Sequence, residues 1–269
     1  LTILMVARII SKEHLNEYRQ ILYGFLLTLL PVLLIMIEPD FGTTLVFWAS
    51  LIAMLIAADV PLFYILLCIS PIVSIISSVW LPAIPIWILI LVILLLKAHL
   101  SWVAITVSGI INVFIALITP VFWMGLKEYQ QNRILTFIDP TRDPLGAGYQ
   151  IIQAKIAIGS GSVFGKGWLK GTQKNMKFLP EHHTDFIFSV LGEEFGFVGC
   201  ILLLLLFAAF FWRLIHNIGE LKVRERKVAT AGILVYLMFQ TFINIGMNIG
   251  LVPATGIPLP FISYGGSNL

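Results

Sequence analysis

Long apolar stretches alternate with short polar segments along almost the whole chain of 269 residues. A helix needs roughly 20 apolar residues to cross the hydrocarbon core of a bilayer, and most of these stretches approach that length. We therefore predict membrane-spanning helices, the first partial and the fifth short, over residues 1–10, 21–37, 43–57, 62–79, 84–96, 102–124, 186–211 and 229–250. This pattern predicts an all-α polytopic integral membrane protein with a single membrane domain over residues 1–269.

The composition excludes a soluble domain. Hydrophobic residues make up 59% of the chain and charged residues 12%, whereas soluble domains carry about 25% charged residues. The net charge of +3 is too small to indicate nucleic-acid binding. Cys68 and Cys200 lie inside apolar stretches and are interpreted as packing residues. Because the chain begins within an apolar run and ends just after a Gly-Ser turn, we expect a longer protein that is truncated at both ends.

The distribution of basic residues predicts the orientation of the helices. Lys and Arg collect in the cytoplasmic loops of membrane proteins. Alternating sides along the chain then makes one set of loops cytoplasmic and places residues 125–184 outside, as a large extracellular loop. Within it, KEYQQNRI is typical of a helix end, IDPTRDPLGAG is rich in turn residues, and YQIIQAKIAIGSG predicts an amphipathic helix against the membrane surface. The basic residues that carry this argument are Arg8, Lys12, Arg19, Lys97, Arg213, Lys222, Arg224, Arg226 and Lys227.

Asp185 is the strongest candidate for a reactive group. It stands where the polar sequence LPEHHTD meets a long apolar stretch, and a carboxylate at such a boundary is costly and often functional. The alternative, with about even weight, is that Thr184 and Asp185 form an ordinary helix N-cap. Glu181, His182 and His183 precede Asp185 and favour chemistry, because several titrating groups then share one small region. A metal site there is less favoured than an interfacial polar cluster, since adjacent histidines do not face one point.

Glu193 and Glu194 follow Asp185 by about two helical turns. On a helical projection, Glu193 lies near the Asp185 face and Glu194 on the opposite side. A buried polar network explains Glu193 at least as well as direct chemistry does.

Two further groups of residues could bind a phosphate-bearing ligand. Glycines 159, 161, 165, 167 and 171, close to Lys155, Lys166 and Lys170, form either a flexible surface loop or a backbone N–H surface for phosphate. Arg133 and Arg142 could clamp phosphate oxygens or pair with nearby carboxylates.

Two segments contain too many helix breakers to be straight helices: EPDFGTT at residues 38–44 and NIGLVPATGIPLPFISYGGS at residues 248–267. Irregular backbone next to membrane spans must line a cavity or be shielded by protein. We expect them to form a wall of the site, with a rigid external turn as the alternative.

Taken together, four segments resemble the SEDS family (shape, elongation, division and sporulation) of bacterial cell-wall polymerases, and most closely its RodA-type members. They are EPDFGTTLV, YQQNRILTFIDPTRDPLGAGYQIIQAKIAIGSG, GKGWLKGTQKNMKFLPEHHTDFIFSVLGEEFGFVG and GLVPATGIPLPFISYGGS. Each alone is weakly specific, but the four in this order are specific. Residues 62–96 would add two spans to the family's usual count.

The resemblance implies an inverting peptidoglycan glycosyltransferase that polymerises lipid II at the outer face of the cytoplasmic membrane during cell-wall elongation. It carries the catalytic base onto Asp185. We further expect a class B penicillin-binding protein, a transpeptidase, as partner. No cofactor is identified, and a divalent cation is left open. The residues expected to bind substrate, with the first two at the pyrophosphate, are Arg133, Lys155, His183, Thr184, Glu193 and Ser263.

Two other functions stay open at this point. A lipid II flippase would also contain broken helices and intramembrane acids, but it should concentrate its charges near the bilayer midplane. A non-catalytic cell-shape scaffold would use Asp185 only to cap a helix.

Overall fold

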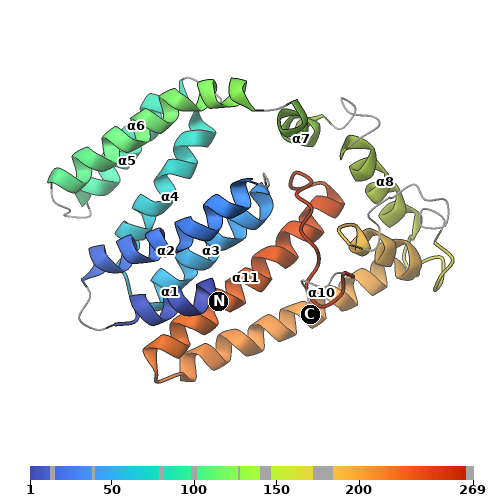
Figure 1. Ribbon diagram of the computed structural model, residues 1–269. Coiled ribbons are helices and arrows are strands. Elements are labelled where there is room, and N and C mark those ends of the chain that lie inside the picture. Colours follow the sequence, from blue (N-terminus) through green and yellow to red (C-terminus); the bar gives the residue numbers. More distant parts are fainter. Residues whose placement is uncertain are drawn as a thin grey trace. The chain divides into compact units, whose positions relative to one another are not determined.

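All regular structure in the described part of the chain is helical. The computed structural model describes residues 1–12, 16–37, 40–78, 82–97, 102–126, 128–139, 147–171 and 184–264, and no strand occurs among them. The helices (Figure 1) are α1 (Thr2–Ile10), α2 (Glu17–Ile37), α3 (Phe41–Ala57), α4 (Leu62–Ser77), α5 (Ala83–Lys97), α6 (Trp102–Gly125), α7 (Glu128–Ile138), α8 (Ala147–Ser160), α10 (Ile187–Glu220) and α11 (Arg224–Ile249).

The predicted spans are confirmed as helices, each within a few residues except α10, which continues nine residues beyond its prediction. In the described part, α2, α6, α10 and α11 each contain a stretch long and apolar enough to cross a membrane. The apolar parts of α3, α4 and α5 are shorter. The chain is therefore a polytopic helical membrane protein, as its hydropathy predicts.

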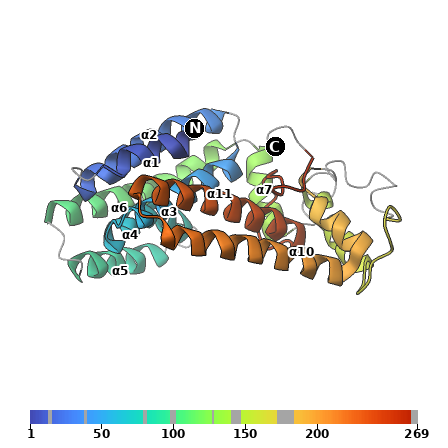
Figure 2. The same cartoon turned by 90° about the horizontal axis from the view of Figure 1, so that it is seen from below.

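The chain divides into two compact units, of which the first comprises Leu1–Met54 and Asn132–Leu269. Here α11 is central, because α1, α8 and α10 all pack against it. Figures 1 and 2 both show α10 and α11 side by side, joined by a short turn. The start of α3 also packs on α11, where Val46 and Ile243 share a buried cluster with Ile257.

Helix α8 presents a stripe of mostly small residues to the protein interior. Gly148, Ile151, Ala154, Ala157 and Gly161 are buried at intervals of three or four residues, and α8 packs on both α10 and α11. Small side chains let helix backbones approach closely. The predicted helix is confirmed. Its apolar residues do not all face outward, because Ile151 is buried against the neighbouring helices, whereas Ile156 is exposed.

Helix α10 is interrupted at Gly196. This residue has φ +69° and ψ −164°, a conformation outside the helical region and open mainly to glycine. A side chain is also excluded there, because a Cβ would lie 2.6 Å from the carbonyl oxygen of Val163. The kink therefore separates the first turns of α10 from its long apolar part.

The second unit, Leu55–Gln131, contains α4, α5 and α6. A buried polar cluster joins these helices. Asn112 of α6 accepts from Ser74 Oγ at 2.6 Å and donates through Nδ2 to Ser70 Oγ at 3.0 Å. Trp87 of α5 donates through Nε1 to Ser74 Oγ at 2.8 Å. In apolar surroundings such interhelical hydrogen bonds fix which helices pair and in what register.

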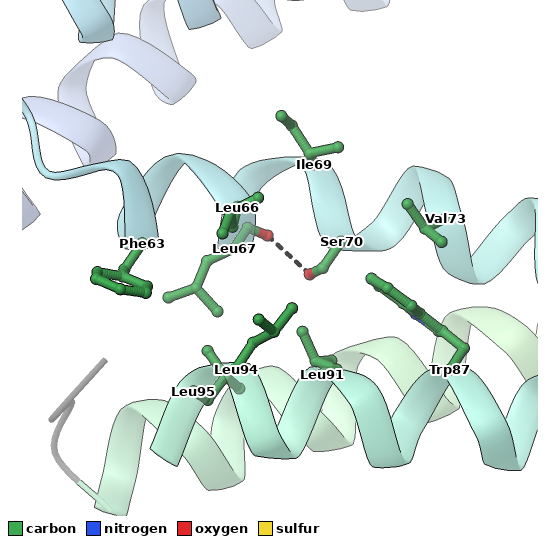
Figure 3. A pocket seen from close by; sticks show the side chains of 10 residues that line it. All are labelled: Phe63, Leu66, Leu67, Ile69, Ser70, Val73, Trp87, Leu91, Leu94 and Leu95. Atoms are coloured by element: carbon green, nitrogen blue, oxygen red, sulfur yellow. Dashed lines mark hydrogen bonds between the residues drawn. The ribbon is translucent and has the colours of Figure 1, made fainter. Parts of the chain in front are cut away.

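An apolar pocket of about 250 Å³ adjoins this cluster (Figure 3). Leu67 and Ser70 of α4 face Leu91 and Leu94 of α5 across it. Only residues of the second unit line it, and almost no polar surface faces the space. We assign the pocket no chemistry.

Replacing Asn112 by Leu should destabilise the second unit by about 1–2 kcal/mol, because the two interhelical hydrogen bonds are lost. Unfolding of the full-length protein by SDS in mixed micelles measures this. Ser108→Ala is the matched control, since the Ser108 hydroxyl lies 3.4 Å from Asn112 Nδ2 and contributes little. Equal effects of the two substitutions would contradict the assigned role of Asn112.

Candidate active site

Asp185 lies in a turn, two residues before the first residue of α10, and is half-buried. The N-cap of α10 is Phe186, whose side chain cannot accept a hydrogen bond. The N-cap therefore falls on Phe186 rather than on Thr184 or Asp185, contrary to the capping alternative. The orphan N–H groups of the first turn must find acceptors elsewhere.

Asn248 of α11 supplies one of these acceptors. Its Oδ1 accepts from the backbone N–H of Ser189 at 3.1 Å, as an N-cap side chain would. Its Nδ2 donates to the backbone carbonyl of Asp185 at 3.0 Å. A single buried amide thus binds both the first turn of α10 and the residue that carries the candidate carboxylate.

Asn244, one turn earlier on α11, strengthens this arrangement. Its Nδ2 donates to the Asp185 carbonyl at 2.9 Å and to the Ile257 carbonyl at 2.7 Å. Both Asn244 and Asn248 are fully buried. Two amide donors on one carbonyl fix the peptide of Asp185 and tie it to the segment that follows α11.

That segment, residues 250–264, is irregular and passes beside Asp185. Ser263 Oγ donates to the Thr184 carbonyl at 2.6 Å and accepts from the Leu259 N–H at 2.7 Å. Gly256, at φ +74°, lies so close that a Cβ on it would be 3.5 Å from Asp185 Oδ2. The C-terminal segment thus forms a wall of the candidate site, as its helix breakers predict.

The EPDFGTT motif lies against the same segment. Asp40 caps α3, because its Oδ1 accepts from the Thr43 N–H at 3.0 Å. A Cβ on Gly42 would come within 2.7 Å of Thr255 Cβ, so the two backbones are in close contact here. The expectation that this motif is irregular is wrong for its second half, because residues 41–44 form the first turn of α3. This turn contacts residues 255–257 of the C-terminal segment, beside Gly256, although the two are separated by some 200 residues of sequence.

Glu193 is fully buried and forms an ion pair with Lys166, with Nζ 2.7 Å from Oε1. Backbone hydrogen bonds join the same two segments. The Lys166 N–H donates to the Glu193 carbonyl and the Gly167 N–H donates to the Glu194 carbonyl, each at 3.0 Å. A Cβ on Gly171 would lie 2.9 Å from Glu193 Oε2. Glu193 thus lies in a buried polar network, which is the predicted alternative to a direct role in chemistry.

Lys155 is exposed and lies over the end of α11. A Cβ on Gly250, the left-handed C-cap of α11, would overlap its Cε and Nζ. The negative end of a helix dipole stabilises a cation in that position. Its neighbour Ala154 packs on Phe186, which brings the Lys155 turn of α8 next to the start of α10.

Of the remaining predicted residues, several fall outside the described structure. Arg133 belongs to α7, but its side chain is not among the parts described. Arg142, Glu181, His182 and His183 also lie outside the described residues. Among the residues that are described, no group of three or more His, Cys, Asp or Glu side chains is arranged to hold a metal ion.

A model of the FtsW/RodA/SpoVE family of cell cycle proteins matches residues 1–89 and 83–269 of the chain. The chain belongs to this family. This confirms the resemblance drawn from the four sequence motifs, since the SEDS proteins carry these names.

Individual members of the FtsW/RodA/SpoVE family are similar over different parts of the chain. Peptidoglycan glycosyltransferase MrdB of Escherichia coli K12 is 46% identical over 176 residues, which are 65% of this chain and 47% of MrdB. The probable peptidoglycan glycosyltransferase FtsW of Aliivibrio salmonicida is 33% identical over 271 residues, covering 98% of this chain and 56% of that protein. Stage V sporulation protein E of Bacillus subtilis is 46% identical over 161 residues, covering 58% of this chain and 43% of that protein. The chain spans about half the length of the curated relatives it matches.

A solved structure is similar over the whole chain. It comes from work titled "Structural coordination of polymerization and crosslinking by a peptidoglycan synthase complex" and aligns with a TM-score of 0.63 at 26% identity. The alignment covers 100% of this chain and 62% of the solved one.

Sequence reasoning missed Asn244 and Asn248. Both are amides in an otherwise apolar helix, spaced four residues apart and therefore on one face. That spacing is a usable signal, because buried amides in a membrane helix need partners on another element.

Removing Asn248 should destabilise the start of α10. Asn248→Ala removes an acceptor and a donor from buried backbone groups, which costs about 1–3 kcal/mol. Asn248→Asp keeps the acceptor but replaces the Nδ2 donor by an oxygen, which repels the Asp185 carbonyl. We therefore expect Asn248→Asp to lower the stability at least as much as Asn248→Ala does. Gln240→Ala is the matched control on the same helix, since its side chain makes a single 3.2 Å bond with Tyr236. Thermal unfolding of the full-length protein in detergent would refute the assignment if the Asn248 and Gln240 variants melted alike.

Lys166→Met should be strongly destabilising, because it leaves the carboxylate of Glu193 buried beside an apolar side chain. Since Lys166 itself is 30% exposed, we expect a loss of about 2–3 kcal/mol, below the range for fully buried pairs. Adding Glu193→Gln should recover part of that loss. Lys170→Met, an exposed lysine in the same loop, is the control. Unfolding that does not distinguish Lys166→Met from Lys170→Met would argue against the ion pair.

Proposed function

We propose that the chain carries the reaction site of a peptidoglycan glycosyltransferase that polymerises lipid II, with Asp185 as the general base. The observation that carries the proposal is the environment of Asp185. Its backbone carbonyl accepts from Asn244 and Asn248, and its carboxylate borders the wall at Gly256. The preceding carbonyl, of Thr184, accepts from Ser263. The proposal is further supported by relatives named peptidoglycan glycosyltransferase.

In the proposed step, Asp185 takes the proton of the acceptor sugar's 4-hydroxyl. The acceptor oxygen forms a bond to the anomeric carbon of the donor. The bond from that carbon to the pyrophosphate oxygen breaks, undecaprenyl pyrophosphate leaves with the electron pair, and the anomeric centre inverts. A base works best when its position is fixed before the substrate arrives, which is the role we give to the amides of Asn244 and Asn248.

The pyrophosphate needs cations near the same end of the protein. Lys155 is our first candidate because it is exposed and its helix packs on Phe186. Arg133, His183 and Thr184 stay as predicted substrate-binding residues. Ser263 and Glu193 act, in this proposal, through the backbone of Thr184 and through Lys166.

The setting of this reaction is also part of the proposal. Residues 125–184 form the extracellular loop, and the protein lies in the bacterial cytoplasmic membrane with Asp185 at the outer face. The partner is a class B penicillin-binding protein that cross-links the new strands. The similar solved structure bears on this point, since its title describes a complex for polymerization and crosslinking.

Asp185→Asn and Asp185→Ala should each lower the rate of glycan polymerisation by about 10²–10⁴-fold, the usual contribution of a general base. Purified full-length protein with its partner and lipid II is assayed for polymer by gel. Glu225→Gln, which removes an exposed carboxylate at the start of α11, is the control and should retain activity. All variants are first compared by thermal unfolding, to separate loss of fold from loss of chemistry.

Polymer synthesis by a folded Asp185→Ala protein would remove Asp185 from the mechanism. Lipid II movement across vesicles without any polymer in the unmodified protein would instead favour a flippase.

A further inference from the structure

The loop between α8 and the candidate site exposes large apolar side chains. We call residues 163–169 the aromatic loop. Phe164 is 83% exposed and Trp168 67% exposed, and Val163 and Leu169 are also more than half exposed. In water this surface would be unfavourable, since large apolar side chains gain free energy when they are removed from water.

The aromatic loop is bound to α10 beside the Gly196 kink. The N–H groups of Phe197 and Val198 donate to the carbonyls of Ser162 and Val163 at 2.9 and 3.1 Å. The Trp168 ring meets the Phe195 ring edge-on, with centroids 5.5 Å apart. The exposed side chains therefore hold a fixed position relative to the helix.

The neighbouring surface of α10 is apolar and exposed in the described structure. From Phe197 to Trp212 its exposed residues are apolar and mostly large, including Leu202, Leu205 and Leu206. The first charged residue beyond Trp212 is Arg213. Trp212, which is 75% exposed, thus marks one membrane–water boundary, where aromatic residues collect.

The part of the apolar face of α10 that lies beyond the Gly196 kink accounts for most, but not all, of a bilayer crossing. Phe197 to Trp212 spans about 23 Å at 1.5 Å per residue, whereas the hydrocarbon core is about 30 Å thick. The aromatic loop extends this apolar surface at its N-terminal end, next to Phe197. Its composition, Phe and Trp followed by the exposed Lys170, is that of a segment at the interface, where a lysine reaches the headgroups.

We infer that the aromatic loop inserts Phe164, Trp168 and Leu169 into the membrane–water boundary at the Asp185 end of α10, where they contact lipid. The backbone conformation of Leu169 is consistent with a side chain held in a fixed outward direction. Its φ of +61° is strained for a leucine, yet its side chain points outward rather than into the protein. If the proposed function holds, this contact sets the height of Asp185 relative to the headgroups from which a lipid-linked sugar projects, but the contact itself does not depend on that function.

The test is fluorescence quenching in the full-length protein, reconstituted in bilayer nanodiscs. The probes are phosphatidylcholine brominated at shallow acyl positions, and aqueous iodide. The contribution of Trp168 is the difference between unmodified protein and Trp168→Phe, a conservative change that preserves the ring contact with Phe195. Trp212→Phe gives the matched signal for the opposite boundary.

We expect loss of Trp168 fluorescence in brominated lipid comparable to the loss for Trp212, and a smaller loss with iodide. A Trp168 signal quenched by iodide but not by brominated lipid would place the loop in water and overturn the inference. A signal that neither probe reaches would mean that protein covers the loop, such as the membrane anchor of a partner, and would also overturn it. Because no polymerisation is measured, these outcomes are independent of the test of Asp185.

Discussion

A membrane helix that is interrupted must satisfy its unpaired backbone groups from within the protein, because the hydrocarbon core offers no water. Helix α10 has two such places: its start beside Asp185 and the kink at Gly196. Asn248 accepts from the first turn, and the backbone of residues 162–167 forms hydrogen bonds with the backbone on both sides of the kink. These hydrogen bonds also shape the candidate site, because Asn248, which accepts from the first turn of α10, donates to the backbone carbonyl of Asp185.

The glycines of the loop before the site are explained by the same constraint. A Cβ on Gly161 would overlap the Gly192 carbonyl, and one on Gly165 would overlap the Glu194 carbonyl. These positions need backbone contact with α10, so they are neither flexible spacers nor an anion-binding surface. Lys166 likewise turns inward to Glu193. Of the lysines considered for phosphate binding, Lys155 and Lys170 are the ones that present exposed side chains.

Much of the fold could be predicted from the sequence because hydropathy alone specifies where helices cross a bilayer. Asp185 could also be chosen as a candidate from the sequence, since a carboxylate at the border of an apolar stretch differs from its neighbours. The residues that bind the Asp185 backbone could not be predicted. Asn244 and Asn248 become informative only when α11 lies against α10, and that pairing depends on shape and small residues rather than on periodicity. The surroundings of Ile151 in α8 could not be predicted for the same reason: an apolar side chain is equally suited to lipid and to a neighbouring helix, and only packing decides between them.

The kink at Gly196 reconciles two demands that one straight helix cannot meet. Under the proposed function the carboxylate of Asp185 must reach water, and α10 must also cross the bilayer with an apolar surface. In α10 most residues before the kink are buried in protein, among them Phe188, Val190 and Glu193. From Phe197 onward most residues are exposed and apolar. The buried part is bound to α8 and α11, so its direction is set by protein contacts and not by the membrane. Glycine at position 196 is what allows that change within one residue, because any side chain would displace the loop whose backbone holds both halves together.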